Sequence, residues 1–222
     1  MTDWDDLEQA FSAPRLGRYL RAFGNDKERA QLGYIHNLRL SESLLIPLSV
    51  LEIALRNAMS RQMAKVYNRD DWYEAILTDT ALLKPGKPLR ADKALQKLHN
   101  SITGAKSDAG APNPNKVIAE FSFGFWTTLL NSRYNAAFWH ELRFAFPHCP
   151  RPKRQRDPVS RALNQVRDLR NRIFHHEPVL WMTPPVEDYH HYIYEVLSWL
   201  NHDIAPWVQQ FDRFPEVHAE QP

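Results

Sequence analysis

Residues 26–67 read DKERAQLGYIHNLRLSESLLIPLSVLEIALRNAMSRQMAKVY, and this stretch decides the fold class. Apolar side chains recur in it mostly at steps of three or four residues, which is the period of one helix face. The repeating positions are Leu32, Ile35, Leu38, Leu45, Leu48, Leu51, Leu55, Met59 and Met63. Asp26 is placed to cap the first turn, and Pro47 lacks the backbone N–H that a helix interior needs. The pattern therefore predicts two helices, over residues 26–44 and 46–67.

The rest of the chain predicts more helices and no sheet, because β-branched residues nowhere alternate with polar ones over a useful run. Similar apolar spacing predicts helices at about 3–23, 72–83, 91–103, 116–130, 135–146, 159–176, 186–203 and 205–212. Gly, Pro, Asn and Asp predict loops over 104–115 and 148–158. We expect one all-α domain over residues 1–222, with residues 1–24 as an N-terminal extension and 213–222 as a polar, frayed tail.

Composition narrows the class of protein further. Hydrophobic residues make up 43% of the chain, which is enough for a buried core. The single cysteine, Cys149, excludes an internal disulfide framework and fits a reducing compartment. The acidic start is unlike a secretory signal, and the most apolar run, Leu44–Leu55, is far shorter than the ~20 residues that span a bilayer. We expect a soluble, cytoplasmic protein without a membrane segment.

The charge is concentrated in one region although the net charge is only +2. Residues 151–172 contain eight basic residues but only two acidic ones, Asp157 and Asp168. Such an excess either attracts phosphate groups or forms a solvated face, and charge alone does not decide between them.

Arg170 and His175 stand at the end of the best amphipathic helix, over 159–176. Their spacing also occurs at Arg143–His148 and Arg213–His218, so spacing alone identifies no site. On a helix Asn171 and His175 share a face, whereas Arg170 lies about 140° away from His175. An imidazole beside a permanently charged guanidinium is the minimum equipment for phosphodiester chemistry, but spacing and context alone favour a capping histidine with a surface arginine.

Three segments resemble motifs of the Abi-like (abortive infection) family in the HEPN superfamily. They are LEIALRN at 51–57, AEFSFGFW at 119–126 and LRNRIFHHEP at 169–178, in the family's order, and the likeness covers roughly residues 25–205. The resemblance implies a HEPN-like helical bundle with additional peripheral helices. It also implies a homodimer whose two Arg–His segments share one cleft, and metal-independent RNA cleavage through attack of the 2′-hydroxyl that leaves a 2′,3′-cyclic phosphate.

The resemblance assigns roles to particular residues. His175 would be the general base or acid, with His175 of the second copy able to take the other role. Arg170 would stabilise the transition state, and Asn171 would orient His175 or the phosphate. Supporting roles would fall to Glu52, Arg56 and His176, although Glu52 and Arg56 also read as a plain i,i+4 ion pair. The basic run predicts RNA-binding side chains, for which we name Arg154, Arg156, Arg167 and Arg172.

The functional expectation is a toxin-like endoribonuclease in phage defence that needs no metal or other cofactor. Its partners would be an RNA substrate, a second copy of the chain and a possible antitoxin, guide RNA or phage trigger. The main alternative is a HEPN-fold module that binds RNA or protein without cutting. A weaker one is a metal-dependent hydrolase that uses the pairs His175–His176 and His190–His191, whose adjacent histidines point to different faces.

Overall fold

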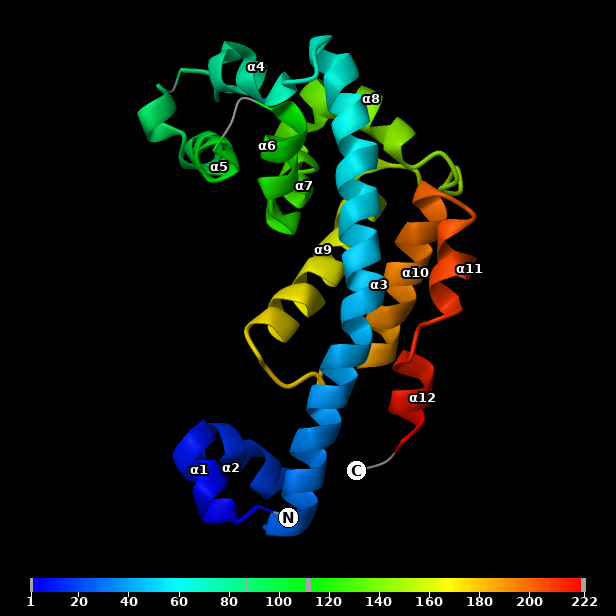
Figure 1. Ribbon diagram of the computed structural model, residues 1–222. Helices are drawn as coiled ribbons and strands as arrows, with labels where there is room; N and C mark the ends of the chain where they lie inside the picture. Colours follow the sequence, from blue (N-terminus) through cyan, green and yellow to red (C-terminus); the bar gives the residue numbers. More distant parts are fainter. Residues whose placement is uncertain (1, 87, 111–112, 221–222) are drawn as a thin grey trace.

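The protein is built along one long helix, as the computed structural model of residues 2–86, 88–110 and 113–220 shows (Figure 1). No strand occurs in these described residues, so the fold is all-α as predicted. The helices are α1 (Trp4–Phe11), α2 (Ala13–Ala22), α3 (Lys27–Tyr67), α4 (Trp72–Thr78), α5 (Lys93–Ala109), α6 (Pro114–Glu120), α7 (Phe123–Leu129), α8 (His140–Leu142), α9 (Arg156–Phe174), α10 (Val186–Leu200), α11 (Ile204–Gln209) and α12 (Phe214–Ala219).

The predicted break at Pro47 is wrong, because α3 runs unbroken for 41 residues. Its start is as expected: the Asp26 carboxylate accepts a hydrogen bond from the Arg29 backbone N–H at 3.0 Å. Pro47 is buried in the helix, and α10, α11 and α12 all pack against α3. A proline removes one backbone hydrogen bond, and burial against neighbouring helices offsets that loss here.

The apolar stripe of α3 is buried in its second half only. Leu48, Leu51, Leu55, Met59 and Met63 are in the core. The first half instead buries its opposite side, against α2 and the loop that follows α9, and leaves part of the predicted stripe in solvent. The exposed members are Leu32, Ile35, Leu38 and Leu45, at 38–47% exposure.

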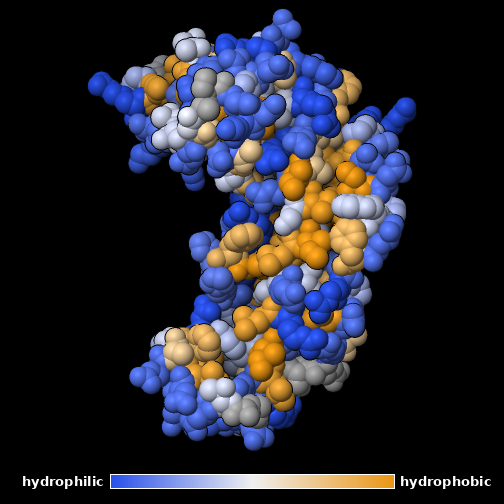
Figure 2. Space-filling view, in the orientation of Figure 1, coloured by the Kyte–Doolittle hydropathy of each residue, from blue (hydrophilic) through white to orange (hydrophobic). Residues whose placement is uncertain are grey.

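Two clusters of buried side chains hold the molecule together. The larger one surrounds the second half of α3 and includes the aromatic rings of Trp72, Phe121, Phe125 and Trp126. The smaller one joins α1 and α2 to the start of α3 through Trp4, Leu16, Tyr19, Ala30 and Tyr34. The N-terminal extension is therefore a helical hairpin, which projects to the same side as α4 and α5 at the other end of α3 (Figure 1). The space-filling view shows the hollow between these two projections (Figure 2).

Several predicted boundaries need correction. The expected loop over 104–115 is helical up to Ala109, where Gly110 ends α5 with a φ of 63°; residues 111–112 lie outside the described ranges. The expected helix over 116–130 is two helices, because Ser122 caps a new one by accepting from the Phe125 backbone N–H at 3.3 Å. The expected helix over 135–146 is a series of short helical turns, of which α8 is one.

The tail is not frayed over residues 213–220. It contains α12, which lies against α3. Glu220 forms a two-pronged ion pair with Arg39, and Arg213 pairs with Glu42 at 3.3 Å. These contacts join residues far apart in the sequence, so a local reading of polarity could not reveal them. Residues 221–222 lie outside the described ranges.

None of the helices in the described ranges combines the length and the apolar character that crossing a membrane requires.

Candidate functional site

The end of α9 is a hydrogen-bonded helix terminus that presents His175. The His176 backbone N–H donates to the Ile173 carbonyl and the Glu177 N–H to the Arg172 carbonyl, both at 2.9 Å. His176 adopts a left-handed conformation with a φ of 56°. This is the Schellman arrangement, which turns the chain away from the helix axis. His175 is therefore left at the helix end with its side chain exposed.

Asn171 and His175 line the same pocket, of about 330 Å³. Asp168, Arg172, Glu177 and Tyr189 contribute its other polar groups. Arg172 is held at the rim, because its Nη1 donates to the Pro178 carbonyl at 3.2 Å and lies 3.4 Å from a Glu177 carboxylate oxygen. The pocket thus combines an imidazole, a primary amide and a cation.

Arg170 lies on the side of α9 that faces α3. Its Nε is 3.7 Å from Glu52 Oε2, and its guanidinium carbon stands 4.1 Å above the ring of Phe174. The Nε atom is buried and has no hydrogen-bond partner among the described residues. Glu52 is therefore close enough to orient Arg170 by charge, although 3.7 Å is too long for a hydrogen bond. Arg56 instead donates to the Ala119 carbonyl at 3.4 Å.

Arg170 and His175 do not meet within one chain. Residues five apart on a helix are separated by about 140° around its axis. The pocket that His175 lines does not include Arg170, which packs beside Glu52. The structure thus joins Asn171 with His175, and Arg170 with Glu52, as two groups on different sides of α9.

The predicted RNA-binding arginines fall into two separate groups. Arg167 and Arg172 lie near Asn171 and His175. Arg154 and Arg156 lie at the other end of α9, which is roughly 27 Å long. There Arg154 donates to the Pro147 carbonyl at 3.2 Å and Arg156 to the Leu130 carbonyl at 3.0 Å. Only the first group can therefore act beside the end of α9.

A second hollow, of about 420 Å³, lies between α5, α7 and α9. It shares Asp168 and Asn171 with the pocket of His175, so the two hollows are neighbours along α9. Lys97 and Ser101 line it from α5, and Thr128 lines it from α7. Sequence reasoning missed these three residues, since they belong to no motif and come together only through packing.

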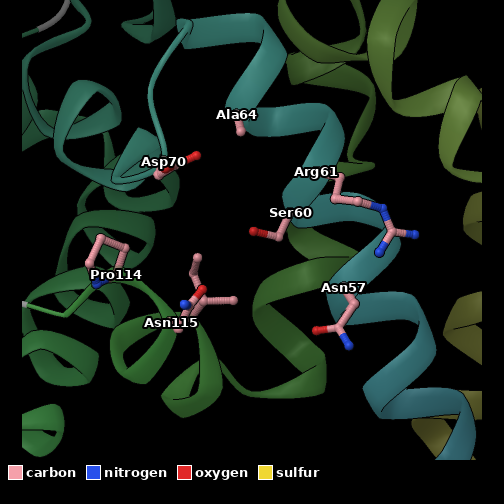
Figure 3. A pocket seen from close by; sticks show the side chains of 8 residues that line it. Asn57, Ser60, Arg61, Ala64, Asp70, Pro114 and Asn115 are labelled. Carbon is pink, nitrogen blue, oxygen red and sulfur yellow. The ribbon is translucent and has the colours of Figure 1, made fainter.

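A third hollow, of about 410 Å³, lies further along α3 (Figure 3). Ser60 and Asn115 face each other across it, while the Arg61 side chain extends away from Asn115 (Figure 3). The Ser60 hydroxyl already accepts a hydrogen bond from Trp72 Nε1 at 3.0 Å. This hollow contains none of the predicted catalytic side chains.

The two other histidines that stand five residues after an arginine, His148 and His218, pack or pair with other side chains. His148 lies against the ring of His202, with centroids 3.9 Å apart. His218 lies 3.2 Å from a Glu187 carboxylate oxygen, and Arg213 pairs with Glu42. Each of these histidines thus contacts a side chain other than the arginine five residues before it.

His190 has a carboxylate partner, and Cys149 is buried. His190 Nε2 lies 2.6 Å from an Asp212 carboxylate oxygen that also accepts from the Tyr194 hydroxyl at 2.6 Å. The described residues contain no group of three or more His, Cys, Asp and Glu side chains arranged to hold a metal ion. Burial raises the pKa of the Cys149 thiol to about 11, which keeps it protonated near neutral pH, unlike a nucleophilic thiolate.

Comparison of the chain with models of protein families, with curated proteins and with solved structures finds no match.

Proposed function

We propose that this chain is a metal-independent RNA endonuclease that acts as a toxin-like effector in phage defence. The observation that carries the proposal is the end of α9, where Asn171 and His175 line one exposed pocket and Arg170 is held nearby by Glu52 and Phe174. The resemblance of residues 51–57, 119–126 and 169–178 to the Abi-like family supports the same chemistry.

In the proposed reaction the 2′-hydroxyl of the RNA attacks the adjacent phosphorus atom. The bond to the 5′-oxygen of the next nucleotide breaks, which leaves a 2′,3′-cyclic phosphate and a free 5′-hydroxyl. His175 takes the proton from the 2′-hydroxyl or gives one to the leaving oxygen, and His175 of a second copy takes the other role. Arg170 stabilises the negative charge that builds on the phosphate oxygens, and Asn171 orients the phosphate or the imidazole.

An exposed apolar face of α3 supports the homodimer that this reaction needs. It consists of Leu32, Ile35, Leu38, Leu45, Ile46 and Ile53, each 38–50% exposed. Figure 2 shows apolar side chains gathered along α3 on the face turned to the viewer. Apolar patches of this kind mark interaction surfaces. Ile53, at one end of this face, is next to Glu52 in the sequence, so the face extends to the region of Arg170.

The test is incubation of the purified chain with single-stranded RNA in EDTA, followed by mass spectrometry of the ends. We expect 2′,3′-cyclic phosphate ends, no cleavage at a 2′-deoxy position and no activity in His175→Ala. The matched control is His148→Ala, an exposed histidine with the same spacing from an arginine, which should remain active. Cleavage at a 2′-deoxy position, or an active His175→Ala, would refute the mechanism.

A binding module without catalysis is the second candidate. It is favoured by the separation of Arg170 and His175 on different sides of α9 within one chain. Retained RNA binding together with no cleavage of any RNA would select it. If wild-type chains mixed with an excess of His175→Ala protein lose activity beyond the effect of dilution, the composite dimer is selected instead, because a mixed dimer has only one His175.

A further inference from the structure

We infer that the hollow between α5, α7 and α9 binds the ribonucleotide next to the scissile phosphate, with Lys97 and Arg167 contacting the RNA backbone. This inference rests on the proposed function but uses a different part of the surface. At about 420 Å³ the hollow is within the size range of small-ligand sites. The shared residues Asp168 and Asn171 place it directly beside the pocket of His175.

The two cations of the hollow are suited to bind a phosphate. Lys97 is exposed, and the described residues offer it no ion-pair partner. Arg167 is fixed in place, because its Nη1 donates to the hydroxyl of Thr127 at 3.0 Å and Thr127 is only 1% exposed. That contact uses one of the five N–H donors of the guanidinium. The Asp168 carboxylate lies 3.9 Å from Arg167 Nε, so one acidic group faces two basic ones.

The rest of the lining is suited to a nucleoside. Leu98 and Phe125 line the hollow but are only 1% and 3% exposed, so they form its packed wall and leave contacts with a nucleoside to the hydroxyl groups. Ser101 and Thr128 both line the hollow. Their hydroxyls donate to the carbonyls of Lys97 and Gly124, at 3.0 and 2.8 Å. Each hydroxyl oxygen is thereby left as an acceptor, which suits the N–H groups of a base or the 2′-hydroxyl of a ribose.

The experiment measures RNA binding apart from cleavage. His175→Ala protein, which the proposed mechanism makes inactive, is titrated into a short fluorescent single-stranded RNA at several salt concentrations. Lys97→Gln and Arg167→Gln are added singly and together, and Lys65→Gln serves as an exposed lysine outside the hollow. Thermal unfolding checks that each variant is folded.

We expect each variant of the hollow to raise the Kd about tenfold at low salt and to reduce the slope of log K against log salt by about 0.7. The double variant should reduce the slope by about 1.4, and Lys65→Gln should leave it unchanged. Thr127→Val should weaken binding without changing the slope, because the charge of Arg167 remains. The slope therefore distinguishes the loss of a phosphate contact, which lowers the slope, from a general loss of structure, which leaves it unchanged.

Unchanged affinity and slope in folded Lys97→Gln and Arg167→Gln would overturn the inference, as would the absence of RNA binding by the His175→Ala protein. The two proposals can fail separately. Cleavage by the wild-type chain with an unaltered slope in the variants would remove only the nucleotide site. A reduced slope without any cleavage would keep that site and remove the endonuclease.

Discussion

His176→Gly should stabilise the protein, because His176 closes α9 in a conformation that favours glycine. Its φ is 56° and its side chain is exposed, so the substitution removes few contacts. The left-handed conformation costs a non-glycine residue about 1–2 kcal/mol. Glycine loses about 0.5–1 kcal/mol more backbone entropy on folding. The free energy of unfolding should therefore rise by about 0.5–1 kcal/mol, which in a chain of this size raises Tm by about 1–4 °C.

Circular dichroism melts and urea titrations of the purified protein measure this difference. His175→Gly is the control, because His175 has an ordinary φ of −89° and glycine there should lower stability by about 0.5–1 kcal/mol. A His176→Gly protein that melts at or below the wild type would refute the strain argument. Its cleavage activity separates two roles for His176: retained activity indicates a backbone role, whereas loss of activity in a folded protein indicates that the imidazole takes part.

The remaining predictions concern charge and packing. Hydrogen bonds from Arg133 and from two backbone N–H groups hold the pKa of Asp92 well below its usual range. The stability that the charged Asp92 carboxylate contributes is therefore complete above a pH of about 4, the pKa of the unfolded chain, and is lost as the pH falls through the lower folded pKa. The Tm of the wild type should consequently drop in acid more than the Tm of Asp92→Asn. Glu52→Gln should slow RNA cleavage about tenfold, equivalent to about 1.4 kcal/mol, by releasing the arginine it faces, and an unchanged rate would deny Glu52 that role. Leu51→Ala should cost about 2–5 kcal/mol in urea unfolding because the side chain is fully buried, whereas Leu89→Ala, 39% exposed and outside the apolar face of α3, should cost under about 0.5 kcal/mol.

The helical period of the apolar residues predicted the position of α3 in the sequence but not which of its sides is buried. The first half of the apolar stripe is exposed because other elements cover the opposite side. There the side-chain oxygen of Asn37 accepts from the backbone N–H of Val179 at 2.7 Å, and Tyr34 packs against Tyr19. Both contacts join distant parts of the sequence, so a local period contains no information about them. The predicted helix break at Pro47 was wrong for the same reason, because tertiary packing offset the local cost of a proline inside a helix.

The candidate site was predictable as far as a single helix determines it. Asn171 and His175 are four residues apart on α9, and helix geometry alone places them on one face. The contact between Glu52 and Arg170 depends on the packing of α3 beside α9, and only the family resemblance suggested it. No sequence pattern indicated that Lys97 and Thr127 lie beside Arg167, because the packing of α5 and α7 around α9 brings them there.

The separation of Arg170 from His175 also constrains how the proposed cleavage can work. Five residues along a helix amount to a rise of about 7.5 Å and a turn of about 140°, so the two side chains leave α9 in different directions. Arg170 would have to give up both Glu52 and the ring of Phe174 to turn toward its own His175. A second copy needs no such rearrangement, because it can bring its His175 to the side of α9 where Arg170 already lies. The apolar face of α3 is exposed on the chain that would form this contact. We therefore expect cleavage per chain to fall on dilution, in step with the dissociation of the dimer, and to be restored by raising the protein concentration.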